Sequence, residues 1–358
     1  MTTQTEALPL ARRPVRDTGL QVSVLGMGTA PLGNLFARLD EASAVDSIVT
    51  AIQGGINLID TSPWYGLGLA ELRVGTATRR AARGREDLVI STKVGRWMNP
   101  MASQAHEVAD VAAPGWAAPL NHHAVLDYSY DGTLRSIEQS LLRTGLDRID
   151  LALIHDVDVW THGEAAIEEL FSQAMNGAYR ALHRLREEGV VKGIGIGVNE
   201  AEMCERFAQA GDFDAMMLAG RYSLLEQPAL DSFLPLAEKK RIAMLLGGVF
   251  NSGILATGAV AGARYNYREA PVEIVEKVRA IERVCAAHQV RLADASLQFA
   301  LAHPAVGSLV LGAVTPKEVL RNIESVQSEI PEGLWSDLRL EGLLPSHAPT
   351  PCSAVTAP

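Results

Sequence analysis

The stretch Asn57-Leu58-Ile59-Asp60-Thr61-Ser62-Pro63-Trp64-Tyr65-Gly66 decides how this chain of 358 residues is interpreted. A short apolar run ends at Asp60, with two glycines before it and Thr-Ser-Pro after it, which is typical of a buried parallel strand. Asp60 then lies at the carboxyl end of a strand, and Tyr65 follows it closely. Because ligands bind at this end of the strands in parallel sheets and barrels, we expect a functional site around these two residues.

Apolar runs of this kind alternate with helical patterns along the whole chain. Eight strand-helix repeats predict an α/β fold, a (β/α)8 TIM barrel, and the turn at Arg16-Asp17-Thr18-Gly19-Leu20 predicts an N-terminal β-hairpin at its bottom. The expected strands cover residues 24–28, 56–60, 88–92, 149–154, 191–197, 215–218, 242–246 and 308–311. The expected helices cover residues 41–53, 70–83, 130–143, 174–188, 201–210, 228–240 and 280–303.

Two segments are too long for simple connections. Residues 95–127 and 250–269 are expected to form long loops over the carboxyl-terminal rim of the barrel. A single barrel domain over residues 1–343 is expected, followed by a disordered tail over residues 344–358.

Composition and charge exclude several classes of function. The net charge is −10 and no long block of Lys and Arg occurs, so nucleic-acid binding is not expected. The three cysteines lack metal or redox spacing, and the first residues lack a signal peptide, so we expect a cytoplasmic protein. Residues 242–263 are uncharged but rich in glycine, which favours a strand and a loop over a membrane helix. His122-His123 has no acidic or cysteine neighbour in ligand spacing, so no metal site is expected.

Polar side chains end the second, third and fourth expected strands. These are Asp60, Lys93 and His155, and a short loop returns Tyr65 to the same rim. Taken singly, a helix cap, a solvated lysine and a core histidine are the simpler interpretations. Together they predict proton transfer: an ammonium next to Tyr65 would lower the pKa of its phenol, which is near 10 when unperturbed. Tyr65 could then exchange a proton while a hydride moves to or from carbon.

These motifs resemble the aldo-keto reductase superfamily of (β/α)8 barrels that use nicotinamide cofactors. The resemblance rests on Asp60-Thr61-Ser62 with Tyr65-Gly66, on Ser91-Thr92-Lys93-Val94-Gly95 and on Leu153-Ile154-His155-Asp156, and covers nearly the whole barrel. It implies that Asp60, Tyr65, Lys93 and His155 form a catalytic tetrad.

Motifs near the expected strand ends resemble the aldose 1-dehydrogenase branch, which includes D-threo-aldose (L-fucose) dehydrogenases and some pyridoxal 4-dehydrogenases. They cover residues 61–66, 155–158, 161–163, 197–200, 221–227 and 251–255. The resemblance implies oxidation of a cyclic hemiacetal, of the L-fucose or D-arabinose type, to a lactone. Aromatic and imidazole side chains suit such a substrate, and we expect Trp64, Trp97, Trp160 and His162 to line its site, whereas Trp116 and Trp335 are interpreted as structural.

The cofactor site is inferred from the same resemblance. The glycine runs 26–28 and 193–197 lack the last glycine of the dinucleotide fingerprint, so the cofactor is expected to lie extended over the rim. Glu318 stands where members that select a 2′-phosphate place cations, which predicts NAD as the preferred cofactor, with NADP as the alternative because Lys317 and Arg321 are near. The implied cofactor-binding residues are Gly28, Asn199, Glu200, Phe250, Gly312, Ala313, Thr315, Glu318 and Asn322.

Other functions stay open at this point. Within the superfamily, the alternatives are a pyridoxal 4-dehydrogenase and a general aldehyde or ketone reductase. A Schiff-base aldolase using Lys93 as nucleophile is a different reaction class that suits a barrel strand end. A redox-sensing subunit without activity is a third alternative, disfavoured by the complete tetrad. In each enzymatic case the partner is a small molecule, and the protein is expected to be a monomer or a small homo-oligomer.

Overall fold

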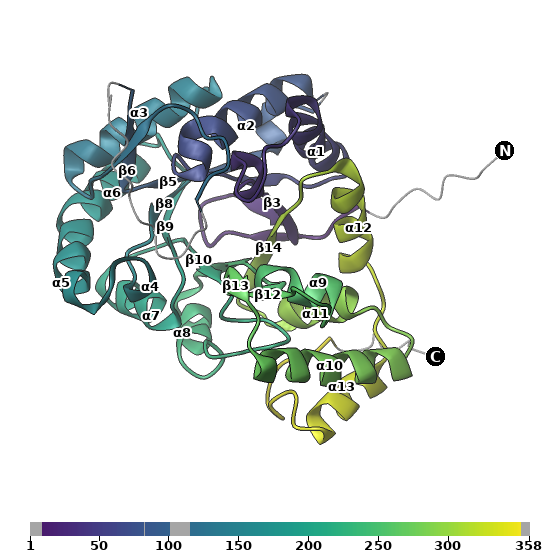
Figure 1. Cartoon of the computed structure of the whole chain (residues 1–358). Helices are drawn as coiled ribbons and strands as arrows, with labels where there is room; N and C mark the ends of the chain where they lie inside the picture. The colour runs from purple at the N-terminus through teal and green to yellow at the C-terminus, as the bar shows by residue number, and fades with distance from the viewer. Residues whose placement is uncertain (1–8, 82, 101–114, 352–358) are drawn as a thin grey trace.

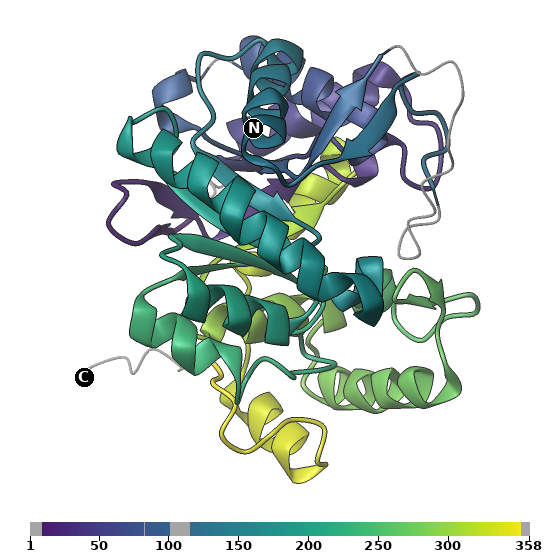
Figure 2. The ribbon, with the colours of Figure 1, turned by 90° about the vertical axis from the view of Figure 1, so that its left-hand side faces the viewer.

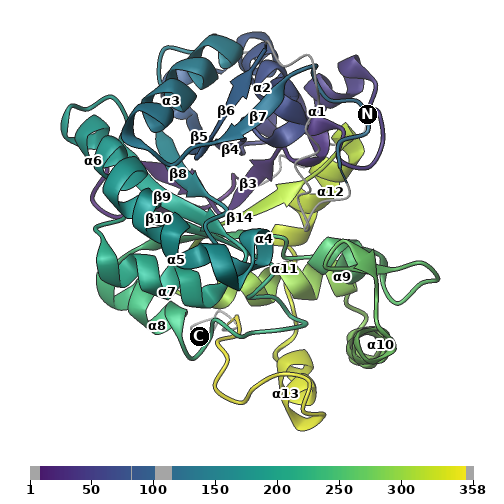
Figure 3. The ribbon, with the colours of Figure 1, turned by 60° about the vertical axis from the view of Figure 1, so that its left-hand side comes forward.

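The computed structural model of the chain describes residues 9–81, 83–100 and 115–351. Eight parallel strands close into a barrel, in the order β10-β11-β14-β3-β4-β5-β8-β9. Helices surround them, which confirms the predicted (β/α)8 barrel (Figures 1 and 3). The strands are β3 (Leu25–Gly28), β4 (Leu58–Asp60), β5 (Val89–Val94), β8 (Leu151–His155), β9 (Gly193–Val198), β10 (Ala215–Ala219), β11 (Ala243–Gly247) and β14 (Val306–Gly312), each overlapping a predicted strand.

The helices follow local signals in the sequence. For example, Asp40 caps the first helix by accepting a hydrogen bond from the Ser43 amide. The helices are α1 (Glu41–Gln53), α2 (Leu69–Arg80), α3 (Tyr130–Thr144), α4 (Val159–His162), α5 (Glu164–Gln173), α6 (Arg180–Glu187), α7 (Ala201–Ala210), α8 (Phe233–Lys240), α9 (Ile254–Thr257), α10 (Val272–Ala287), α11 (Leu292–Ala302), α12 (Pro316–Val326) and α13 (Glu332–Leu340). Within the described residues, every helix is too short or too polar to cross a bilayer.

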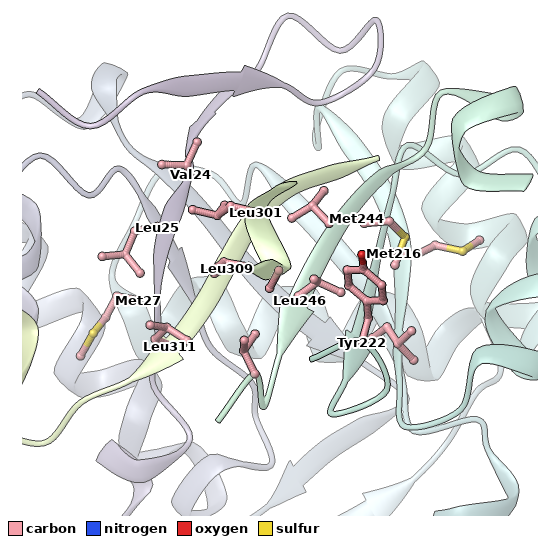
Figure 4. Close-up of a cluster of buried hydrophobic side chains, with 14 of the residues drawn as sticks. Val24, Leu25, Met27, Met216, Tyr222, Met244, Leu246, Leu301, Leu309 and Leu311 are labelled. Atoms are coloured by element: carbon pink, nitrogen blue, oxygen red, sulfur yellow. The ribbon is translucent and has the colours of Figure 1, made fainter. Parts of the chain in front are cut away.

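Alternation along the strands builds two apolar layers. On β10, Met216 and Leu218 face the helices, whereas Ala215 and Met217 face the barrel interior. The outer layer is continuous between strands and helices, and Figure 4 shows part of it, where Leu301 of α11 lies beside Leu309 of β14.

An antiparallel hairpin plugs the bottom of the barrel. It consists of β1 (Arg12–Pro14) and β2 (Gln21–Ser23). Val15, Leu20 and Val22 are buried in one cluster with the inward side chains of the barrel strands. The predicted N-terminal hairpin is therefore confirmed, and the opposite rim is left open for ligands.

Both predicted loops contain strands of their own. Residues 95–127 include an antiparallel hairpin of β6 (Arg96–Asn99) and β7 (His123–Leu126), and their residues 101–114 lie outside the described part. Residues 250–269 include the short hairpin of β12 (Arg264–Tyr265) and β13 (Arg268–Glu269). Figure 2 shows these two insertions, blue and green, on the same side of the molecule.

Two expectations need correction. The helix expected over residues 280–303 is two helices, α10 and α11, because Gln289 adopts a left-handed conformation (φ 58°) without a glycine or proline to signal it. In the tail, Leu344 and Ala348 are buried, and the Arg339 guanidinium donates to the Ala348 carbonyl, so disorder does not begin at residue 344. Residues 352–358 of that tail lie outside the described part.

Candidate active site

The end of β4 and the end of β5 are joined by a buried ion pair. Asp60 and Lys93 are 2% and 1% exposed, and the ammonium donates to both Asp60 oxygens at 2.6 Å and to the Thr61 carbonyl at 3.0 Å. The Ser91 hydroxyl donates to Asp60 Oδ1 at 2.7 Å. Gly197 on β9 leaves room for the lysine chain, since a Cβ there would lie 3.3 Å from Lys93 Cε. Burial raises the pKa of Asp60, and Lys93 and Ser91 oppose this shift.

Tyr65 reaches this pair through an unusual turn. Gly66, Leu67 and Gly68 all have positive φ (65°, 55° and 102°), which turns the chain back over the rim. The turn packs against Gly33 so closely that a Cβ on Gly33 would lie 2.5 Å from the Gly66 nitrogen. The Lys93 ammonium lies 5.6 Å from the centre of the Tyr65 ring.

His155, at the end of β8, completes the group. The Ser62 hydroxyl accepts from the Trp64 amide (3.1 Å) and lies 3.2 Å from His155 Nδ1. We assign Ser62 as the donor in this contact, which places the imidazole hydrogen on Nε2. Burial, and next the positive charges of Arg96 and Lys93, hold the pKa of His155 well below its usual range, so the ring is neutral at pH 7. The structure therefore brings all four predicted residues together, with the His155 and Tyr65 ring centres 5.9 Å apart.

One electrostatic expectation is wrong. Lys93 does not lower the pKa of Tyr65; burial, and next the carboxylates of Asp60 and Asp156, raise it well above its usual value. The physical reason is first that burial penalises the charged phenolate. In addition, Asp60 binds the ammonium through both oxygens, so the pair presents little net positive charge to the phenol. Tyr65 is consequently a protonated phenol in this structure.

Tyr65, Lys93 and His155 line one cavity of about 120 Å³, which we call the catalytic cavity. Its outer wall is aromatic: the Trp116 ring centre lies 6.0 Å from that of Trp64 and 6.1 Å from that of Tyr65. The cavity is lined by Ala30, Leu35, Trp64, Tyr65, Lys93, Trp116, His155, Asp156, Thr161, Gly197, Val198, Asn199, Met217, Ala219 and Tyr267. It combines proton-transfer groups with apolar rings.

A second cavity of about 320 Å³, the rim cavity, continues from it toward β14. The two share Ala30, Leu35, Tyr65, Met217, Ala219 and Tyr267. Gly28, Phe250 and Gly312, all expected at the cofactor, line the rim cavity together with Gly247, Gly248 and Gly253. Glycines leave the backbone open to a ligand, and the N-terminus of α12 after Gly312 favours phosphate groups. The residues present therefore fit an extended dinucleotide.

The other expected cofactor residues surround this groove without all lining it. Asn199 lines the catalytic cavity, and its amide groups donate to Asp158 Oδ2. Glu200 instead accepts from the Val159 amide at the start of α4 and does not line either cavity. Beyond Gly312, Ala313 is buried, Thr315 caps α12, Glu318 accepts from the Val314 amide at 2.8 Å, and Asn322 is half-buried on α12.

Only part of the expected substrate set lines the catalytic cavity. Trp64 does, but Trp97 does not: its indole donates to Asp127 and stacks with Arg135, which anchors the β6–β7 hairpin. Trp160 lines a neighbouring cavity beside Arg221, and His162 of α4 does not line the catalytic cavity. Among the described residues, no group of three His, Cys, Asp or Glu side chains could hold a metal ion.

A family model provides the deciding observation. The model of the aldo/keto reductase family matches residues 24–339, which includes every barrel strand. This chain belongs to the aldo/keto reductase family. It is therefore an NAD(P)-dependent oxidoreductase that acts on small molecules.

Named relatives agree with the family, and a solved structure agrees with the fold. The chain is 40% identical to pyridoxal 4-dehydrogenase of Microbacterium luteolum, over 93% of this chain and 98% of the relative. It is 36% identical to D-threo-aldose 1-dehydrogenase of a Pseudomonas species, over 92% and 96% of the two chains. The fold is similar to that of an aldo-keto reductase from Bacillus halodurans in its holo form, with a TM-score of 0.69, 21% identity and coverage of 93% and 96%.

Several residues of the site escaped the sequence analysis. Ser91 could have been found, because it lies two residues before Lys93 on one strand and so shares its face. Trp116 was interpreted as structural, yet it lines the catalytic cavity. Tyr267 gave no signal, since it occupies a hairpin turn whose sequence, Asn266-Tyr267, lacks the usual glycine.

Proposed function

We propose that this enzyme oxidises the hemiacetal hydroxyl of an aldose, of the L-fucose or D-arabinose type, to a lactone. The observation that carries the proposal is that Tyr65, Lys93 and His155 line one cavity together with the aromatic rings of Trp64 and Trp116, while Asp60 binds Lys93. Aromatic faces pack against the C–H groups of sugar rings. The similarity to a D-threo-aldose 1-dehydrogenase supports the substrate class.

The residues would divide the chemistry as follows. The nicotinamide cofactor supplies the hydride acceptor when bound. Tyr65 takes the proton of the hemiacetal hydroxyl during oxidation and returns it during reduction. His155, neutral and with hydrogen on Nε2, donates to the same oxygen and orients it. Lys93 and Asp60 would hold each other in place next to the phenol.

The cofactor would lie along the rim cavity with its phosphates near α12. Gly28, Phe250 and Gly312 would line its path, with Asn199 near the nicotinamide end. We propose a preference for NAD, because the Glu318 carboxylate lies over the turn into α12, where it accepts from the Val314 amide. A carboxylate there would repel a 2′-phosphate.

A pyridoxal 4-dehydrogenase is the second candidate, favoured by the 40% identical relative. A pyridine ring also suits the wall formed by Trp64, Trp116 and Tyr267. A Schiff-base aldolase is less well supported. The Lys93 ammonium donates three hydrogen bonds to Asp60 and Thr61, so it is not a free amine nucleophile.

A substrate panel tests the proposal. L-fucose, D-arabinose, pyridoxal and simple aldehydes are compared by kcat/KM with NAD and NADP, or with their reduced forms for the aldehydes. The proposal expects the highest kcat/KM with an aldose and NAD. A higher value with pyridoxal would select the second candidate, and borohydride trapping of substrate on Lys93 without cofactor turnover would select the aldolase.

A further inference from the structure

Asp156 follows His155 directly and holds a strained backbone conformation. Its φ is 55°, and its amide donates to the Gly197 carbonyl at 2.8 Å, which fixes a sharp turn after β8. This left-handed region disfavours residues other than glycine, and such strain persists at sites where a side chain is needed. The side chain of Asp156 is therefore a candidate functional group.

The carboxylate is held at the wall of the catalytic cavity. Asp156 Oδ2 accepts from Arg96 Nη1 at 2.7 Å, and the guanidinium of Arg96 lies 5.0 Å from the Trp64 ring centre. The Asp156 side chain is 13% exposed and lines the cavity, whereas the Arg96 side chain is 5% exposed and does not. The pair therefore presents its acceptor, not its donor, to the cavity.

The other carboxylate oxygen faces the imidazole. Asp156 Oδ1 lies 3.3 Å from His155 Nε2, the nitrogen to which we assign the ring hydrogen. A donor and an acceptor thus lie side by side next to the Tyr65 phenol. Two adjacent oxygens of one substrate would match them, one accepting from His155 and the other donating to Asp156.

We propose that Asp156 is a substrate-binding residue that selects compounds with a hydroxyl on the carbon next to the reacting carbon. The reacting oxygen accepts from His155 Nε2, and the neighbouring hydroxyl donates to Asp156 Oδ1 while Arg96 keeps the carboxylate in place. The substrate class is therefore 2-hydroxy aldehydes and their hemiacetals. This inference rests on the proposed function and names the feature of the sugar that the site recognises.

D-arabinose and 2-deoxy-D-ribose differ only in the oxygen at C2 and provide the test. The native enzyme should prefer D-arabinose by about 10- to 100-fold in kcat/KM, the effect of one hydrogen bond to a charged group. Asp156→Asn, whose uncharged amide oxygen is a weaker acceptor, should lower that preference several-fold, mainly through a higher KM for D-arabinose. Asp156→Gly should do the same, and glycine suits the left-handed backbone, so this second variant guards against misfolding.

Asp158→Asn is the matched control. It removes another buried carboxylate two residues away, one that bonds Thr161 and Asn199 and does not line the catalytic cavity. It should change the rates on both sugars by the same factor and leave their ratio unaltered.

Two results would overturn the proposal. One is a native preference near one. The other is an equal fall in kcat on both sugars in the Asp156 variants, because Asp156 would then only orient His155. If the native enzyme oxidises neither sugar, the proposed function fails, but the role of Asp156 can still be tested. In that case kcat/KM for the reduction of glycolaldehyde, which has the 2-hydroxyl, is compared with that of acetaldehyde, which lacks it. The same two results would then overturn the proposal.

Discussion

Tyr65 keeps its proton in the unliganded site because burial and the carboxylates of Asp60 and Asp156 raise the pKa of its phenol. A phenol is ready to donate a proton during reduction, whereas oxidation requires the phenolate. Below the pKa, the phenolate fraction falls tenfold for each unit of decreasing pH. The two directions of the reaction should therefore respond differently to pH.

We expect kcat/KM for aldose oxidation to rise with pH, with a slope near one on logarithmic axes and no plateau below about pH 10, the ordinary value for tyrosine. Reduction of an aldehyde should be nearly independent of pH from neutral values up to that range. His155 adds no acid limb near pH 6.5, because its pKa is lowered and it is already neutral. Initial rates in both directions across this range check the expectation, and a plateau in oxidation near neutral pH would contradict it.

Replacing Lys93 should cost stability as well as activity. Lys93→Met leaves the Asp60 carboxylate buried with Ser91 as its remaining polar partner from this network. Loss of one partner of a buried ion pair costs about 3–5 kcal/mol in the free energy of unfolding. Urea denaturation measures this loss, and the double variant Asp60→Asn with Lys93→Met should recover part of it. An unchanged free energy in the single variant would show that the pair is not buried as described.

At the level of residues, the sequence predicted the polar groups at strand ends but not their electrostatics. Asp60, Lys93 and His155 could be placed because parallel strands end at one rim. The raised pKa of Tyr65 could not be predicted, because it depends first on how deeply the phenol is buried and next on how close the carboxylates of Asp60 and Asp156 lie. That is a matter of side-chain geometry across two strands.

At the scale of elements, the β12–β13 hairpin brings a residue from a distant part of the chain into the site. Its turn residues Asn266 and Tyr267 both have positive φ, at 48° and 63°. The Tyr267 amide donates to the Ser252 hydroxyl at 2.9 Å, and the residue lines both the catalytic and the rim cavity. Tyr267 thus stands where the two cavities join.

Replacing Tyr267 should show whether its ring contributes to ligand binding without affecting the stability of the hairpin. Glycine is the residue that this turn prefers, so Tyr267→Gly should not lower the melting temperature. It should raise KM for both sugar and cofactor, because the wall between the cavities is lost. Tyr267→Phe, which keeps the ring, is the control and should keep both KM values. Unaltered KM values in the glycine variant would exclude a role for the ring.

Elements differed in how well the sequence predicted them. The bounds of α1 and α7 were predicted as observed, since each has a capping or glycine signal and a clear apolar period. The hairpins β6–β7 and β12–β13 were not predicted, because short strands that pair across a long insertion leave no periodic pattern of apolar residues in the sequence. Leu344 and Ala348 were missed for a similar reason: their burial depends on a distant surface.

At the scale of the whole molecule, a closed barrel with its bottom plugged by β1–β2 leaves one rim for ligands. The alternation of apolar strands and helices predicted this architecture because the pattern repeats eight times. The same repetition does not identify the ligand, which depends on the insertions that differ between repeats.

Cofactor binding should stabilise the folded molecule. At 100 times its dissociation constant, a ligand adds about 2.7 kcal/mol to the free energy of unfolding. NAD should therefore raise the melting temperature more than NADP does at the same concentration. Glu318→Gln should reduce the difference between the melting-temperature shifts caused by NAD and NADP, because it removes the negative charge at the start of α12. A larger shift with NADP in the native enzyme would contradict the proposed preference.

Replacement of the Tyr65 hydroxyl tests the central claim most directly. Tyr65→Phe keeps the ring against Trp116 and His155 and removes only the proton-transfer group. Tyr130→Phe removes one hydroxyl from the surface and is the matched control with full activity. With L-fucose or D-arabinose and saturating NAD, we expect NADH formation by Tyr65→Phe to fall by about 10²- to 10⁴-fold, with NAD binding retained. Undiminished NADH formation in this variant would contradict the account.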